Sequence, residues 1–218
     1  MQSRVTTVGP LAAASATAIA ASQSLAGAGN LNLNGSAASS GVATLDEARQ
    51  VVITSAGNDS GINFTIFGTN WAGDQISETV KGANTGAADS VLDYLTVINI
   101  SASGATASTV EVGTTSAAHS PWINLDSWAF GATSVQCAVA GTVSYNVEVS
   151  NDDPNYLGHP IAPAAMAWDN KYVPGSGAGV SIELFASVPA APVWIRIALV
   201  SGSGSVRMTV VQQGNAPY

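Results

Sequence analysis

Charged side chains are scarce in this chain: Asp, Glu, Lys and Arg make up 9% of its 218 residues, against about 25% in an ordinary globular protein. A folded chain of this size exposes roughly 9,000 Å², which so few charges cannot cover. We therefore expect a surface of hydroxyls, amides, backbone and small apolar groups. Such a surface suits an extracellular or virion protein packed against copies of itself better than it suits a cytosolic enzyme.

Positive charge is especially rare. The chain holds six Lys and Arg residues, which are scattered singly, and its formal net charge is −8. Nucleic-acid binding requires clustered basic side chains that neutralise phosphates, so we expect no nucleic-acid partner and, for the same reason, no anionic membrane partner. No stretch approaches the roughly 20 apolar residues of a membrane-spanning helix. Residues 11–28 superficially resemble a signal peptide, but they are rich in Ala and Ser and lack a compact apolar segment.

The residue types that most often carry chemistry are also rare. Cys137 is the only cysteine, so no intrachain disulfide can form, and its apolar neighbours Val135–Val139 predict a buried structural thiol. His119 and His159 are the only histidines, which is too few for a zinc site of three or four clustered ligands. No G-x-S-x-G nucleophile turn occurs. We therefore predict no enzymatic activity and no cofactor.

Several acidic residues occur in pairs. Asp152 and Asp153 follow an expected strand, and Asn58 with Asp59 makes a similar polar turn. Oxygen-rich turns can hold Ca²⁺, but no spaced D-x-D-x-D loop exists, so capping of turns is the favoured interpretation. Asp46–Glu47, Asp89 and Asp93 are interpreted as solvated loop residues, since a glycosidase would need two carboxylates facing each other across a cleft.

What the sequence does contain is alternation with a period of two, which is typical of half-buried β-strands. Apolar residues alternate with polar ones over 62–66, 143–150 and 206–210, and a further stripe of the same period consists of Val193, Ile195, Ile197 and Leu199. Clusters of Gly, Asn, Asp and Ser separate these segments and favour tight turns, at 57–61, 71–74, 101–104 and 201–204. The predicted fold class is all-β, with antiparallel β-sandwich (jelly-roll-like) domains and little helix.

The pattern is interrupted near residues 114–121, where small polar residues predominate. We predict an N-terminal arm with short strands (1–41), a β-sandwich domain (42–114), a linker (115–120) and a second β-sandwich domain (121–218). An irregular stretch near 151–179 is long for a loop in a compact domain, so it is either functional or docked on another surface.

Contacts with partners are predicted at the arm and at two tryptophans. The arm either completes the first sandwich or reaches a neighbouring molecule, in which case Leu11, Ile19 and Leu25 would make the contact. Trp71 lies beside an expected hairpin turn and Trp122 at a domain start, positions at which tryptophan can anchor an interface. A sugar-binding face would instead need aligned aromatics, for example Trp71 with Trp122 or Trp128.

Five segments together resemble a β domain common in the structural proteins of tailed bacteriophages, namely Gly27–Gly35, Gln50–Thr69, Ile76–Gly82, Gly141–Pro154 and Gly204–Gln213. The resemblance implies a virion protein, most plausibly a capsid cement or decoration protein on the capsid surface. It implies the major capsid protein or another virion protein as partner, together with self-association as a dimer or trimer. A tail, neck or fibre component is the main alternative, although the chain lacks the repeats or heptads usual in a fibre, and a carbohydrate-binding β-sandwich module is a further one.

Overall fold

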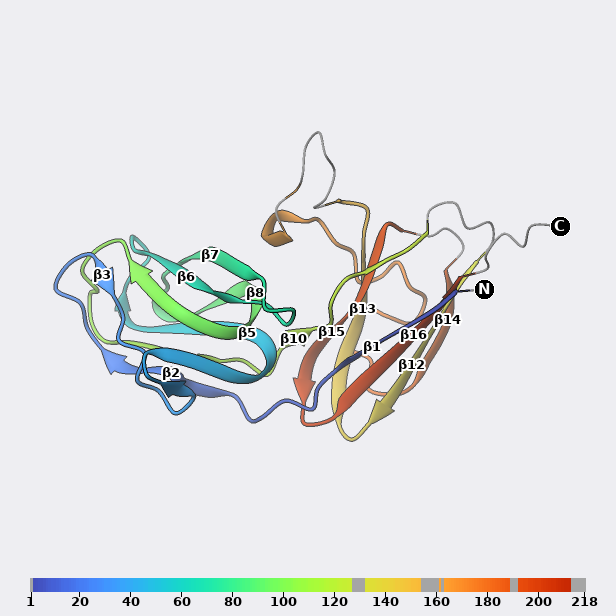
Figure 1. The fold of residues 1–218 in the computed structure, drawn as a ribbon, viewed down its shortest axis with the longest axis horizontal. Helices are drawn as coiled ribbons and strands as arrows, with labels where there is room; N and C mark the ends of the chain where they lie inside the picture. The colour runs from blue at the N-terminus through green and yellow to red at the C-terminus, as the bar shows by residue number, and fades with distance from the viewer. Residues whose placement is uncertain (1, 127–131, 154–160, 162, 189–191, 213–218) are drawn as a thin grey trace. The chain divides into compact units, whose positions relative to one another are not determined.

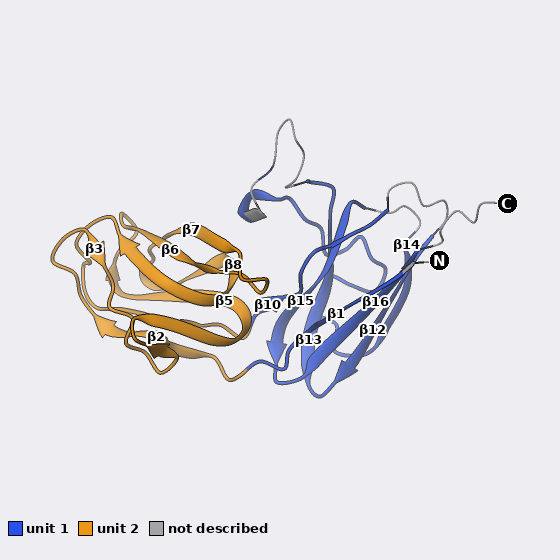
Figure 2. Cartoon of the chain, in the orientation of Figure 1, with its two compact units in different colours: residues 1–11, 117–218 blue, residues 12–116 orange. Residues whose placement is uncertain are grey.

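The computed structural model describes residues 2–126, 132–153, 161, 163–188 and 192–212, which form two compact units (Figures 1 and 2). Unit 1 comprises residues 1–11 and 117–218, and unit 2 comprises residues 12–116. Unit 2 is therefore inserted into unit 1 after its first strand. Within the described residues the regular structure is antiparallel β-strand, apart from the short 3₁₀ helix η1 (Pro163–Ala165). No helix in the described part of the chain is long and apolar enough to cross a membrane. The all-β antiparallel prediction is confirmed.

Unit 1 contains two sheets. The first has four strands in the order β1-β16-β12-β14, with bounds β1 (Gln2–Val8), β16 (Ser205–Gln212), β12 (Thr133–Ala140) and β14 (Leu184–Val188). In the second, β15 pairs with the other three strands, with bounds β15 (Trp194–Gly202), β10 (Ala118–His119), β11 (Ile123–Asn124) and β13 (Val143–Ser150). Because the inner faces of both sheets contribute to one buried apolar cluster, unit 1 is a sandwich.

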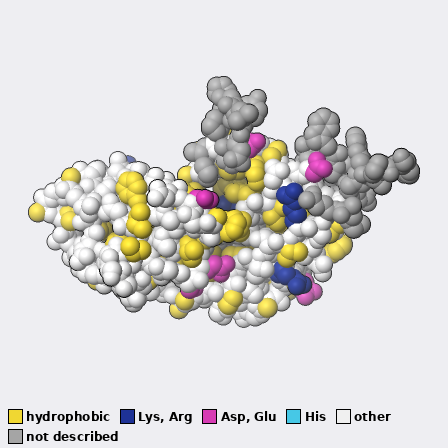
Figure 3. Space-filling view, viewed as in Figure 1, with side chains coloured by type: hydrophobic (Ala, Val, Ile, Leu, Met, Phe, Trp, Pro, Cys, Tyr) yellow, Lys and Arg dark blue, Asp and Glu magenta, His cyan; other side chains and the backbone are white. Residues whose placement is uncertain are grey.

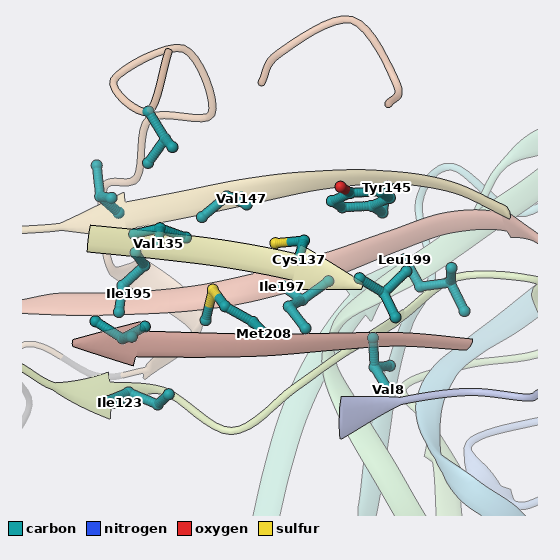
Figure 4. Packing of buried hydrophobic residues seen from close by; sticks show 14 of the residues in the cluster. Val8, Ile123, Val135, Cys137, Tyr145, Val147, Ile195, Ile197, Leu199 and Met208 are labelled. Atoms are coloured by element: carbon teal, nitrogen blue, oxygen red, sulfur yellow. The ribbon is translucent and has the colours of Figure 1, made fainter. Parts of the chain in front are cut away.

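The core of unit 1 is built from the alternating residues of its strands. Figure 4 shows Tyr145 and Val147 of β13 packed with Val135 and Cys137 of β12, and Met208 of β16 beside them. Each of these side chains is buried, while their neighbours in sequence point to the other face of the sheet. The period-two stripes at 143–150, 193–199 and 206–210 are therefore the inward faces of β13, β15 and β16, as predicted.

The single cysteine lies within this core. Cys137 is fully buried, and burial raises the pKa of its thiol to about 11. We expect a disulfide reagent such as DTNB to label native protein at least about 100-fold more slowly than an exposed cysteine, because the thiolate is both rare and inaccessible. In guanidinium chloride, one thiol per chain should react at the normal rate. Labelling of the native protein at that same rate would contradict this assignment.

Unit 2 is a single eight-stranded sheet in the order β2-β9-β5-β8-β6-β7, with β3 paired to β8 and β4 to β5. Its strands are β2 (Ser15–Gln23), β3 (Gly29–Asn30), β4 (Ala38–Ser39), β5 (Val42–Asn58), β6 (Asn63–Thr69), β7 (Gln75–Lys81), β8 (Asn84–Ala102) and β9 (Val110–Thr114). The pairing of the long strands β5 and β8 shifts register at three places. Such bulges bend strands, so the sheet curves around a core that includes Ile53, Phe64 and Ile100.

Residues 1–41, which we expected to form a separate arm, contribute to both units. Strand β1 pairs along its whole length with β16 in unit 1, while β2 pairs with β9 in unit 2. Leu11 is consequently buried in the core of unit 1 and Ile19 in the core of unit 2. This corrects the expectation that Leu11 and Ile19 contact a partner, since both side chains are already covered by the chain itself.

Candidate interaction surface

The outer face of the four-stranded sheet in unit 1, which we term the open face, carries the most exposed large apolar side chain among the described residues, Phe185. Strand pairing places Val5, Thr209, Gln136 and Phe185 in one row across the four strands. Val5 on β1 is 60% exposed and Phe185 on β14 is 76% exposed. Both edge strands of this sheet therefore present a large apolar side chain to solvent, with polar side chains between them.

The rest of the open face is almost uncharged. The row on one side of Val5 and Phe185 contains Ser3, Val211, Ser134 and Ser187, and the row on the other side contains Thr7, Arg207 and Ala138. The guanidinium of Arg207 is thus the single charged group in these three rows. The face of the molecule that Figure 3 presents also carries few charged side chains. The open face thus has the surface expected from the sequence, in which hydroxyls, amides and small apolar groups take the place of charges.

Trp71 lies at the tip of the β6–β7 hairpin in unit 2 and is 59% exposed. The turn beneath it is well defined. Asn70 Oδ1 accepts hydrogen bonds from the backbone N–H groups of Ala72 (2.9 Å) and Asp74 (3.0 Å), and Gly73 adopts a positive φ of 85°. The predicted hairpin is confirmed. A contact between Trp71 and a partner stays a prediction.

Trp122, in contrast, contacts other side chains of unit 1. Its ring lies 4.2 Å from the guanidinium carbon of Arg196, and Arg196 Nε donates a hydrogen bond of 2.7 Å to Glu148. Both charged side chains are buried. Trp122 therefore covers an internal ion pair. Trp71 belongs to unit 2 and Trp122 to unit 1, so the sugar-binding alignment of the two rings stays a prediction. Trp128, the alternative partner of Trp71, lies outside the described residues.

Leu25, the remaining predicted contact, is partly buried and packs against the core of unit 2. Its backbone N–H donates to Thr106 Oγ1 at 3.0 Å, so the segment is held by the unit rather than extended from it. None of the three leucine and isoleucine residues proposed from the arm thus projects freely from the described chain.

The polar turns behave as capping elements. Asn58 Oδ1 accepts from the Ser60 N–H at 3.2 Å, and the buried Asp59 accepts from the Ala107 N–H at 2.7 Å. Asp152 Oδ2 accepts from the Ala167 N–H at 2.6 Å. These contacts agree with the interpretation of these residues as turn and loop caps. Across the described part of the chain, no three His, Cys, Asp or Glu side chains form a group that could hold a metal ion.

The other candidates for chemistry are dispersed. Asp89 and Asp93 lie in strand β8 and Asp46 in β5, which corrects their interpretation as loop residues. The bulges between β5 and β8 disturb the alternation that would have identified these strands from sequence. His119 is half-buried in β10, and His159 lies outside the described residues.

Comparison with family models, curated proteins and solved structures finds no match to this chain. The resemblance to bacteriophage structural proteins therefore stays a prediction from sequence, and geometry must support any proposal of function. Sequence reasoning missed the two strongly exposed large apolar residues of the open face, Val5 and Phe185. A usable signal existed for Val5, because residues 5–8 are all Val or Thr, which are enriched in strands.

Proposed function

We propose that this protein is a non-enzymatic structural component of a tailed-bacteriophage virion, of the cement or decoration type, which binds the major capsid protein lattice through its open face. The observation that supports this most directly is the row from Val5 to Phe185, in which two exposed apolar side chains flank a nearly neutral sheet surface. An edge strand that carries an exposed apolar side chain can pair with, or pack against, another chain.

The size of the open face supports binding at many repeated positions. Four strands spaced at 4.8 Å and eight residues long cover about 500 Å², whereas a stable interface uses about 800 Å² per partner. One such contact would be weak by itself. Repetition over a symmetric lattice, or self-association of this chain into a dimer or trimer, adds contacts and so raises the overall affinity.

The chemistry of the open face also suits a virion. Hydroxyl and amide groups can hydrogen-bond to a partner without depending on screened charges, so changes in ionic strength should affect the contact little. Buried apolar area contributes roughly 25 cal/mol per Å² before the costs of association. A tail or neck position would use the same contacts at a smaller number of sites.

The test combines location with mutation. The copy number of the chain per virion is measured by quantitative mass spectrometry against the major capsid protein, and a ratio of about one, or a simple fraction of one, is expected for a cement protein. In parallel, Phe185→Glu should abolish binding to capsids that lack the protein, because it puts a carboxylate where the most exposed apolar side chain of the open face would be buried. The melting temperature should change little, since Phe185 is exposed.

Ile98→Glu is the matched control, because Ile98 is an exposed apolar residue on β8 of unit 2, outside the open face. It should bind capsids like the wild type. A copy number of about a dozen or fewer would favour the tail or neck alternative. Absence from purified virions, or unchanged capsid binding by Phe185→Glu, would refute the proposal.

A further inference from the structure

A pocket of about 480 Å³ opens at the end of strand β13 in unit 1. Its lining includes Asn151 and Asp152, which follow β13, and Trp168, Asp169 and Tyr172 from the irregular stretch after η1. Its volume lies in the range of small-molecule sites, roughly 300–1,000 Å³. None of these lining residues belongs to the open face, so the proposed capsid contact does not account for the pocket.

Trp168 is the largest side chain in the pocket, and both of its neighbours in sequence are fixed. Ala167 donates its N–H to Asp152 Oδ2 at 2.6 Å, and its carbonyl oxygen accepts from Ser150 Oγ, also at 2.6 Å. Asp169 exchanges two backbone hydrogen bonds of 2.9 Å with Val149 on β13. The backbone is thus held on each side of an indole that is nevertheless 49% exposed. Because the backbone that carries this exposed ring is already ordered, less conformational freedom is lost when a ligand stacks on it.

The polar groups of the pocket are held as well. Asp169 Oδ1 accepts from the Lys171 N–H at 2.5 Å, and Asn151 Oδ1 accepts from the Val193 N–H at 3.3 Å. Asp152 is fixed by its bond from Ala167. Each bond uses one atom of its side chain, so each carboxylate keeps a second oxygen and Asn151 keeps its amide NH₂ as a donor. The site therefore combines carboxylate acceptors and an amide donor with two exposed aromatic rings, Trp168 and Tyr172.

We propose that this pocket binds a neutral saccharide. A pyranose ring has one apolar face of C–H groups that can stack on an indole, and vicinal hydroxyls that donate strong hydrogen bonds to carboxylates. An anionic ligand does not fit, because Asp152 and Asp169 are both acidic and no Lys, Arg or His occurs among the described residues that line the pocket. A wholly apolar ligand would leave these polar groups unsatisfied.

Ligand-observed NMR with the full chain tests this assignment. The probes are the neutral trisaccharides chitotriose, cellotriose and maltotriose, with trigalacturonate as an anionic counterpart of similar size. We expect saturation transfer to at least one neutral trisaccharide at millimolar concentration and none to trigalacturonate. Trp168→Ala should weaken that binding about tenfold or more, and Asp169→Asn should weaken it by a smaller factor.

Trp71→Ala is the control for loss of an exposed tryptophan outside the pocket, and it should leave saccharide binding unchanged. If Trp168→Ala proves unstable, Tyr172→Ala tests the second ring. The proposal fails if none of the neutral trisaccharides binds, if trigalacturonate binds equally well, or if the pocket variants bind like the wild type. Phe185→Glu should retain saccharide binding, so failure of the capsid proposal and failure of the saccharide proposal are distinguishable.

Discussion

Replacing Arg49 by methionine is expected to lower the free energy of unfolding of unit 2 by about 3–5 kcal/mol, because charge-assisted hydrogen bonds to two chain segments are lost. Arg49 is 1% exposed. Its Nη1 donates to the Ala12 carbonyl oxygen at 2.9 Å and to Asp46 Oδ1 at 3.1 Å, and its Nη2 donates to the Thr115 carbonyl oxygen. The Arg49 guanidinium thus hydrogen-bonds to both the first residues and the last residues of unit 2.

Methionine would fill much of the same volume but donate no hydrogen bond. The carbonyls of Ala12 and Thr115 would each lose a charged donor, and a hydrogen bond to a charged group contributes about 1.5–3 kcal/mol. Because native domains are stable by only about 5–15 kcal/mol, unit 2 should become marginal. Urea unfolding followed by circular dichroism, with hydrogen exchange of peptides from β5 and β9, would measure the loss and assign it to unit 2.

Arg49→Lys is the informative comparison, because an ammonium keeps the charge but cannot reproduce the planar fork that reaches two separate chain segments. It should fall between the wild type and Arg49→Met. A methionine variant that unfolds at nearly the wild-type urea concentration would show that the guanidinium does not hold the ends of unit 2 together.

The same cluster adds a pH dependence. Burial by itself would raise the pKa of Asp46, but the Ala12 N–H and the Arg49 guanidinium outweigh it, and the net pKa lies below the ordinary value. A carboxyl whose pKa is depressed on folding stabilises the protein fully above its unfolded pKa, near 4, and loses that contribution as the pH falls further. In Arg49→Met, the contribution that the Asp46–Arg49 interaction makes to this loss of stability at low pH should disappear.

The local structure could be predicted from sequence because periodicity reports which side of a strand is buried. The stripes of β13, β15 and β16 and the turn around Trp71 needed no knowledge of the rest of the chain. The pairing of β1 with β16 was different, because its partners are about 200 residues apart in sequence. Nothing in the local sequence of Gln2–Val8 identifies the distant strand that it joins.

The candidate sites were harder to predict for a related reason. Phe185 lies between Leu184 and Ala186, so three consecutive apolar residues conceal which one faces solvent. Trp168 and Tyr172 lie in the irregular stretch near 151–179, whose length did mark it as functional or docked. Their convergence with Asn151 and Asp152 depends on hydrogen bonds between chain segments, which no local pattern encodes.

The buried ion pair of unit 1 yields the second large prediction. Glu148 and Arg196 occupy directly paired positions on β13 and β15, and both are buried beside Trp122. Glu148→Leu alone would leave the Arg196 guanidinium buried without its carboxylate, which costs about 3–5 kcal/mol. Arg196→Met alone should cost a similar amount, because the Glu148 carboxylate would then be the uncompensated charge.

The double variant Glu148→Leu/Arg196→Met should be far more stable than the sum of these losses, within roughly 1–2 kcal/mol of the wild type. Replacing both partners removes two desolvated charges together, and the methionine side chain can still pack under the Trp122 ring. Urea unfolding of the four proteins in the cycle measures the coupling free energy, with Arg207→Met on the exposed side of β16 as a control expected to change stability by less than about 0.5 kcal/mol. Additive losses in the double variant would mean that each side chain stabilises unit 1 through its own packing, and that the charges themselves contribute little to holding β13 against β15.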